Sequence, residues 1–172
     1  YNLHFEKGEN VGGLKKEKTS KNQTGTKTKW KPDLDVFTDI NVRDEYFQDV
    51  LKRQAVVNPN LLFVYRFQKE DGSFEEKEFI YENGITDYVN EIAAGENLTS
   101  VQNWSADRVG RDREDKSEYK VKMEFALTFS NKIKKIEYYH NSSFLEHGGS
   151  PERAVKQAFV SQICLLYTSD AA

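Results

Sequence analysis

The chain has 172 residues, of which 31% are charged, and its formal net charge is −3. Its mean hydropathy is −0.78, and no apolar run approaches the roughly 20 residues that a membrane-spanning helix needs. These values indicate a soluble chain, and so small a net charge implies no overall polyelectrolyte attraction to DNA. The length fits one domain or parts of two. Because the sequence starts without Met or a signal peptide, we expect it to begin inside a domain.

Positive charge is nonetheless concentrated in two stretches. Residues 1–31 hold eight Lys and three Glu, and residues 108–135 hold nine Lys or Arg and five acidic residues. Such stretches can follow a phosphate backbone, but solvated strand faces have the same composition. Arg108, Arg111 and Arg113 could line a DNA passage, although the acidic residues among them favour a salt-bridged surface loop.

The N-terminal residues predict a short β-hairpin. Tyr1–Phe5 is predicted as a strand, Glu6–Asn10 as a turn and Val11–Lys16 as a returning strand. Lys18–Gln23 is polar and is expected to form a loop tip.

A further strand is predicted over Thr24–Asp33, where β-branched or aromatic residues alternate with lysine. The alternating residues are Thr26, Thr28 and Trp30 against Lys27, Lys29 and Lys31. Gly25 lets another backbone or a ligand approach closely. Pro32 cannot donate to a strand ladder, so it ends the strand.

This stretch resembles the late part of the ATPase domain of bacterial type II topoisomerase B subunits, the family of DNA gyrase B and its topoisomerase IV counterpart. The resemblance rests on Thr24-Gly25-Thr26, the alternating strand, Lys31-Pro32-Asp33 and Val36-Phe37-Thr38-Asp39. In that family the second Thr of the motif lies on the floor of the nucleotide pocket, where its hydroxyl helps to bind adenine. The resemblance therefore implies that Thr26 contacts adenine and that Gly25 permits its close approach.

A helix is predicted next, from about Val42 to Val57, with Asn41 as its N-cap. Its apolar residues follow a helical period and should form one buried face. They are Phe47, Val50, Leu51 and Ala55. Two strands and a short helix follow, in the order that the resemblance implies.

The first of these strands, Leu61–Phe67, is apolar on both faces and is expected to be central in a sheet, or partly uncovered where this chain lacks the rest of that sheet. Asp71-Gly72 predicts a hairpin turn, after which Phe74–Tyr81 returns as a more polar strand. Apolar residues at helical spacing then predict a short helix that ends at Gly95. They are Ile85, Tyr88, Val89 and Ile92, whereas Asp87 and Glu91 are interpreted as its solvated face.

Glu96–Leu98 is expected to be a linker, and Val101–Ser105 a strand. Gly110–Ser117 is charged and turn-like. Tyr119–Phe129 alternates without a break and is the clearest strand in the chain. We expect Ile133–His140 to return as its hairpin partner.

An irregular loop is predicted over Asn141–Ser150, followed by a helix that Ser150 caps and Pro151 starts. The buried face of that helix is expected to hold Ala154, Val155, Ala158 and Phe159. The loop, with Gly148-Gly149 after an acidic residue, resembles the transducer domain of the same family. Its Asn141-Ser142-Ser143 departs from the commoner Asn-Asn-Ile, which leaves gyrase or topoisomerase IV open.

The resemblance implies an α+β chain made of two incomplete domains. Residues 1–95 would be the C-terminal part of a GHKL-type ATPase α/β sandwich, and residues 96–163 most of a transducer domain with a ribosomal-protein-like βαβ fold. Residues 164–172 resemble a translated sequencing adapter, so the natural sequence is expected to stop near Gln162 or Ile163. Without Cys164 the chain has no cysteine, which fits the reducing cytoplasm.

The resemblance also implies what the whole protein does. It would be an ATP-dependent type II topoisomerase that binds ATP and Mg²⁺, closes a B-subunit homodimer, and works with an A subunit in an A2B2 heterotetramer on double-stranded DNA, with no membrane partner. The family's catalytic glutamate and magnesium-binding asparagine would lie before Tyr1, and its Gln-Thr-Lys loop after residue 163. The implied nucleotide-binding residues in this chain are therefore Gly25 and Thr26, and no catalytic residue is expected in it.

Two other classes of function stay open. One is another ATPase of the same superfamily, of mismatch-repair or chaperone type, and the other is a non-catalytic nucleic-acid-binding module. His4, His140 and His147 do not have metal-ligand spacing, so no metal site is predicted.

Overall fold

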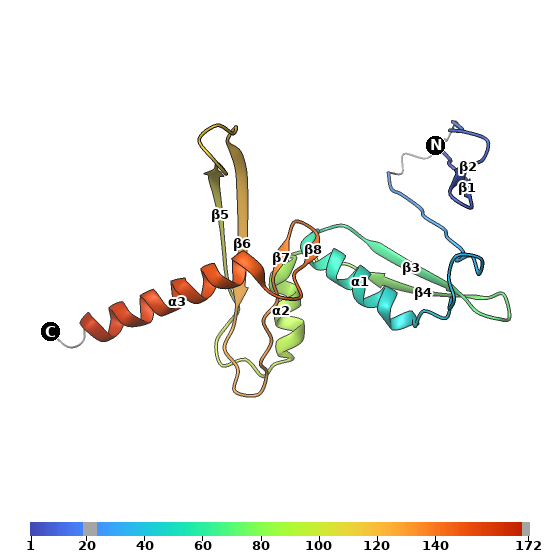
Figure 1. The fold of residues 1–172 in the computed structure, drawn as a ribbon. Helices are drawn as coiled ribbons and strands as arrows, with labels where there is room; N and C mark the ends of the chain where they lie inside the picture. The colour runs from blue at the N-terminus through green and yellow to red at the C-terminus, as the bar shows by residue number, and fades with distance from the viewer. Residues whose placement is uncertain (19–23, 170–172) are drawn as a thin grey trace. The chain divides into compact units, whose positions relative to one another are not determined.

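The computed structural model describes residues 1–18 and 24–169, and these fall into two units, Tyr1–Arg43 and the residues from Asp44 onward. The chain is of mixed α and β composition, with the elements labelled in Figure 1. In the described residues every sheet has two antiparallel strands. The elements are β1 (Phe5–Glu6), β2 (Glu9–Asn10), α1 (Asp44–Val57), β3 (Phe63–Gln68), β4 (Phe74–Phe79), α2 (Ile85–Ala93), β5 (Gln102–Gly110), β6 (Tyr119–Leu127), β7 (Tyr139–His140), β8 (Ser143–Phe144) and α3 (Gly149–Ser169).

The first unit contains the expected N-terminal hairpin in a shorter form. Phe5 pairs with Asn10 across a turn at Lys7-Gly8, and an isolated bridge joins Asn2 to Lys15. The pairing is antiparallel as predicted, but it covers fewer residues than the two expected strands. The loop expected over Lys18–Gln23 lies, apart from Lys18, outside the described residues.

The strand predicted over Thr24–Asp33 is not formed. Alternation gives a segment two faces, but a strand also needs a hydrogen-bonded neighbour, and the described residues supply no strand that pairs with it. After this segment the backbone turns at Asp33, whose carbonyl accepts hydrogen bonds from the N–H groups of Val36 and Phe37.

In the second unit, α1 packs against the β3–β4 hairpin and α2 to form the core. The helix begins at Asp44, two residues later than predicted, so Asn41 is not its N-cap. The backbone N–H of Asn41 instead donates a hydrogen bond to Asp39 Oδ1 at 2.8 Å. The buried residues are Ala55, Val56, Tyr65, Phe79, Tyr81 and Tyr88, with Phe47 and Leu51 packed against them. Val50 was predicted to lie on the buried face of this helix, but it is 40% exposed.

The β3–β4 hairpin and α2 are confirmed. The turn at Asp71-Gly72 places Gly72 at φ 84°, a conformation that glycine adopts without steric cost. Among the described residues β3 pairs with β4 alone, so the expectation of a central strand is wrong here, and Val64 and Phe67 stay 44% and 46% exposed. α2 ends at Ala93, and its C-cap residue Ala94 is left-handed and is followed by Gly95.

The longest ribbon pairs β5 with β6 over nine residues, from Gln102 opposite Leu127 to Gly110 opposite Tyr119. The expected pairing of Tyr119–Phe129 with Ile133–His140 is therefore wrong. An alternating strand can pair with either neighbour in the sequence, and β5 extends further than the predicted Val101–Ser105. After β6 the chain turns at Ser130, whose hydroxyl oxygen accepts from the N–H groups of Lys132 and Ile133.

Residues 133–138 consequently form no strand. Only Tyr139–His140 pairs, and it pairs with Ser143–Phe144 inside the loop that was expected to be irregular. Asn141 enables this tight turn with a left-handed φ of 53°, which asparagine tolerates better than most residues.

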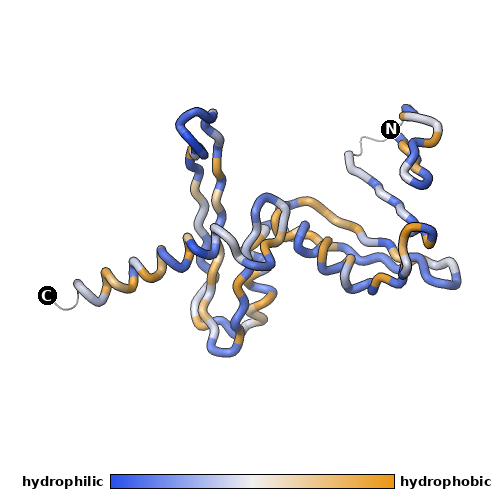
Figure 2. The backbone as a smooth tube through the Cα atoms, viewed as in Figure 1, coloured by the Kyte–Doolittle hydropathy of each residue, from blue (hydrophilic) through white to orange (hydrophobic). Residues whose placement is uncertain are grey.

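The last helix, α3, begins at Gly149 and continues through the adapter-like residues to Ser169. Its predicted buried face is not buried: only Val155 of the four residues is half-buried. Phe159 is 38% exposed and contacts Phe125 of β6, with 6.4 Å between the ring centroids. Figure 2 shows hydrophobic residues along much of this helix. No helix among the described residues is long and apolar enough to cross a membrane.

The domain boundary expected near Gly95–Thr99 remains a prediction, and limited proteolysis can test it on a longer protein that contains this chain. The Leu98 N–H donates to the Phe129 carbonyl oxygen at 2.7 Å, which ties the linker to the end of β6. We therefore expect a protease of broad specificity, such as subtilisin, to cut first in the exposed Gly110–Ser117 loop, and next at the linker. Cleavage that starts within Tyr119–Phe129 would contradict the assignment.

Candidate functional site

The two residues implied to bind nucleotide, Gly25 and Thr26, lie on an exposed segment of the first unit. Nothing lies within 4 Å of the position that a Cβ would take at Gly25, so the backbone is open to close approach. The Thr26 side chain is exposed as well. No described residue forms a second wall of a nucleotide pocket against Gly25 and Thr26, and their role stays a prediction.

The most developed polar site lies in the second unit, around Tyr88 of α2. The ring is buried, with 8% of the residue exposed. Two lysine ammonium groups lie near its face, with Lys52 Nζ 5.6 Å and Lys135 Nζ 5.3 Å from the ring centroid. Both distances are within the range of cation–π attraction.

The Tyr88 hydroxyl continues this arrangement into residues 133–139. It accepts a hydrogen bond from Lys135 Nζ at 3.0 Å and donates one to Glu137 Oε1 at 3.3 Å. Lys135 also pairs with that carboxylate oxygen at 3.0 Å, and the Tyr139 hydroxyl donates to the other one at 2.8 Å. We call Lys52, Tyr88, Lys135, Glu137 and Tyr139 the Tyr88 cluster.

The cluster shifts the titration of its acidic groups. Burial opposes ionisation of Glu137, whose side chain is 13% exposed, but hydrogen bonds from Tyr139 and Lys135 outweigh it and lower the pKa of the carboxyl. Burial and the hydrogen bond to Glu137 raise the pKa of Tyr139. Glu137 is therefore held as a carboxylate and Tyr139 as a neutral donor.

A second carboxylate, Glu91, lies beside the cluster on α2. It accepts hydrogen bonds of 2.5 Å from Lys52 Nζ and from the Tyr81 hydroxyl. Burial opposes its ionisation, yet these bonds lower the pKa of its carboxyl. Glu91 was interpreted from the sequence as part of a solvated face; its side chain is 49% exposed but is engaged with Lys52 of α1 and with Tyr81, which follows β4.

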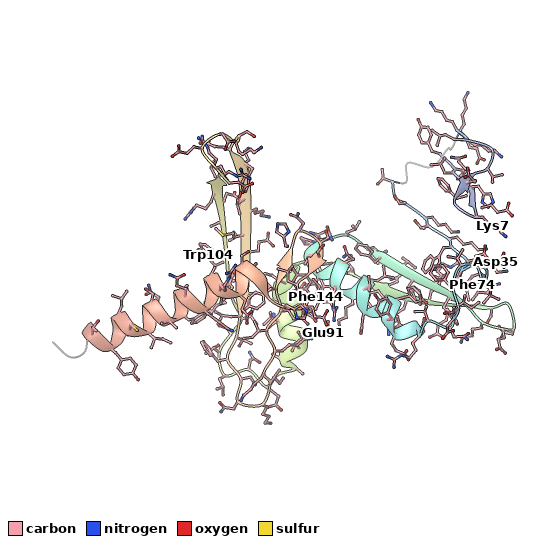
Figure 3. All side chains as sticks on the ribbon, viewed as in Figure 1. Lys7, Asp35, Phe74, Glu91, Trp104 and Phe144 are labelled. Atoms are coloured by element: carbon pink, nitrogen blue, oxygen red, sulfur yellow. The ribbon has the colours of Figure 1, made fainter. Side chains whose placement is uncertain are left out.

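Helix α1 also contacts the β7–β8 turn. The Arg53 guanidinium lies 4.0 Å from the centroid of the Phe144 ring, and Gln54 Nε2 donates to the Ser142 carbonyl at 2.7 Å. Figure 3 labels Glu91 of α2 and Phe144 of β8. The site is thus a junction between α1, α2 and the segment after β6, and its groups suit positioning better than acid–base catalysis.

The three histidines do not converge. Among residues 1–18 and 24–169, no three side chains of His, Cys, Asp or Glu lie close enough together to hold a metal ion.

Comparison with known proteins gives the family. Residues 84–170 match the family model described as DNA gyrase B, which covers α2, the β5–β6 ribbon, the β7–β8 turn and α3. The chain belongs to the DNA gyrase B family. The resemblance read from the sequence, to B subunits of type II topoisomerases, is confirmed at that level.

Curated relatives agree with this family. The chain is 31% identical over 96 residues to the B subunit of DNA topoisomerase 4 from Salmonella typhimurium and, equally, to that from Salmonella typhi. The aligned part is 55% of this chain and 15% of each relative. No solved structure matches the chain.

The Tyr88 cluster of this DNA gyrase B family member was not predicted from the sequence. Tyr88 was assigned only to a helix core, and Lys135 and Glu137 to a strand. The available signal was the alternation of Lys135, Glu137 and Tyr139, which places all three on one side of an extended segment.

Proposed function

We propose that the chain is a segment of the ATP-hydrolysing B subunit of a type II DNA topoisomerase. The match of residues 84–170 to DNA gyrase B carries this proposal, and the Thr24-Gly25-Thr26 motif upstream supports it. In the proposal, residues 1–95 belong to a GHKL-type ATPase domain and residues 96–163 to a transducer domain. The whole protein couples ATP hydrolysis to the passage of one DNA duplex through another, with an A subunit as its partner and ATP-driven pairing of two B subunits.

Within this chain the proposal assigns ATP two contacts. The Thr26 hydroxyl hydrogen-bonds the adenine, and Gly25 lets the base approach the backbone, where the structure has open space. Mg²⁺ and the phosphates are assigned to other parts of the whole protein. Bound ATP supplies the free energy of the reaction; this chain contributes binding and the positioning of α1, α2 and the transducer part.

Substituting Thr26 by alanine in the complete protein tests the assignment. The loss of one hydroxyl hydrogen bond in a partly buried pocket costs on the order of 1 kcal/mol, so affinity for ATP should fall several-fold. Isothermal titration with a non-hydrolysable ATP analogue measures the change. Thr28→Ala, the same substitution two residues away, is the matched control and should leave the affinity unchanged. If the Thr26→Ala variant also binds the analogue with unchanged affinity, the Thr26 side chain does not contact the nucleotide.

A further inference from the structure

The segment after β6 has few backbone contacts to fix its place. Residues 133–138 form no strand ladder, and the backbone hydrogen bond from the Leu145 N–H to the Tyr138 carbonyl ties them to the β8 side rather than to α1 or α2. Their position relative to the helices therefore depends on side chains. The side chains that make this connection are those of the Tyr88 cluster.

The hydrogen bonds of the Tyr88 cluster depend on one another. The Tyr88 hydroxyl both accepts from Lys135 and donates to Glu137, and Glu137 receives further hydrogen bonds from Lys135 and Tyr139. A carboxylate this well buried is stable only while its donors remain in place, because an unpaired buried charge is costly. Pulling the segment away from α2 would break these contacts together.

We propose that the Tyr88 cluster is a latch, which locks residues 133–139 onto helices α1 and α2. Its regulatory meaning rests on the proposed function. While the contacts of the latch are formed, residues 133–139 move together with α1 and α2. When these contacts are broken, the helices can move without the segment. Lys52 joins the latch to α1 through the Tyr88 ring and through Glu91.

The latch itself can be tested on the chain without ATP or DNA. Spin labels at Asp49→Cys on α1 and Lys134→Cys in the segment, in a Cys164→Ser background, report the distance between the two by electron–electron double resonance. We expect one narrow distance distribution, and a broad or second, longer one after Tyr88→Phe, which removes only a hydroxyl, or Glu137→Gln. Glu124→Gln, which neutralises an exposed carboxylate paired with Lys122, should leave the distribution narrow. Unchanged distributions in both latch variants would overturn the proposal.

A second arm tests coupling in the complete protein with its A subunit. Tyr88→Phe should retain ATP turnover while the DNA topology changed per ATP falls several-fold. If the distances broaden but that ratio is unchanged, the coupling role is wrong. If the unaltered protein shows no ATP-dependent change of DNA topology, the proposed function fails, and the distance measurement still decides whether the latch exists.

Discussion

Val56→Ala should destabilise the second unit by about 2 kcal/mol. Val56 is 1% exposed and lies in the core formed by α1, the β3–β4 hairpin and α2. Alanine removes two methyl groups, at about 0.8 kcal/mol each by transfer, and leaves a cavity whose lining loses contacts. The core of this unit has few buried residues, so little packing remains to offset the loss.

Val50→Ala is the matched control, since it makes the same chemical change on the same helix at a residue that is 40% exposed. It should alter the free energy of unfolding by no more than about 0.5 kcal/mol. Urea unfolding followed by circular dichroism measures both variants. Equal destabilisation by the two would show that the core is not where the structure places it.

The chain alone should neither hydrolyse ATP nor bind it measurably. Hydrolysis needs a base that positions water and groups that stabilise the phosphates, and the proposed function assigns both to other parts of the whole protein. In this chain the Thr26 segment is exposed, so no enclosure excludes water from a nucleotide bound there. We therefore expect no detectable ATP hydrolysis by the chain alone, and not merely a slower rate.

A phosphate-release assay on the purified chain, with an ATP titration beside it and the complete protein as the positive control, measures this. Clear magnesium-dependent turnover would contradict the expectation. The catalytic groups would then have to lie among Glu6, Glu9, His140 or His147, all of which are exposed in this structure.

Local patterns predicted the part of the fold that local contacts determine. The helical spacing before Val57, the Asp71-Gly72 turn and the stop at Gly95 each act within a few residues, and α1, the β3–β4 hairpin and α2 form as expected. β3 stays partly exposed because it lies in a two-stranded sheet, and the faces of such a sheet are buried only where another element packs against them.

Patterns could not determine which strands pair. The alternation of Tyr119–Phe129 gives it a side to bury but does not choose between the strand before it and the segment after it, and the structure pairs it with β5. The same limit applies to Thr24–Asp33, whose alternation predicts a strand only if a neighbouring strand is present. The Tyr88 cluster was missed because its lysines and carboxylate are separated by up to 85 residues in sequence, between Lys52 and Glu137, and only the tertiary fold joins them.

In the proposed function this segment belongs to a protein that changes DNA topology at the expense of ATP. The most direct measurement incubates the complete B subunit and its A subunit with closed circular DNA and Mg²⁺, with and without ATP, and separates the topoisomers on a gel. We expect the distribution of topoisomers to shift with ATP, to stay unshifted or shift far less without it, and to shift more slowly at limiting ATP in the Thr26→Ala variant. A folded, assembled complex that leaves the topoisomers unchanged in the presence of ATP would contradict the claim.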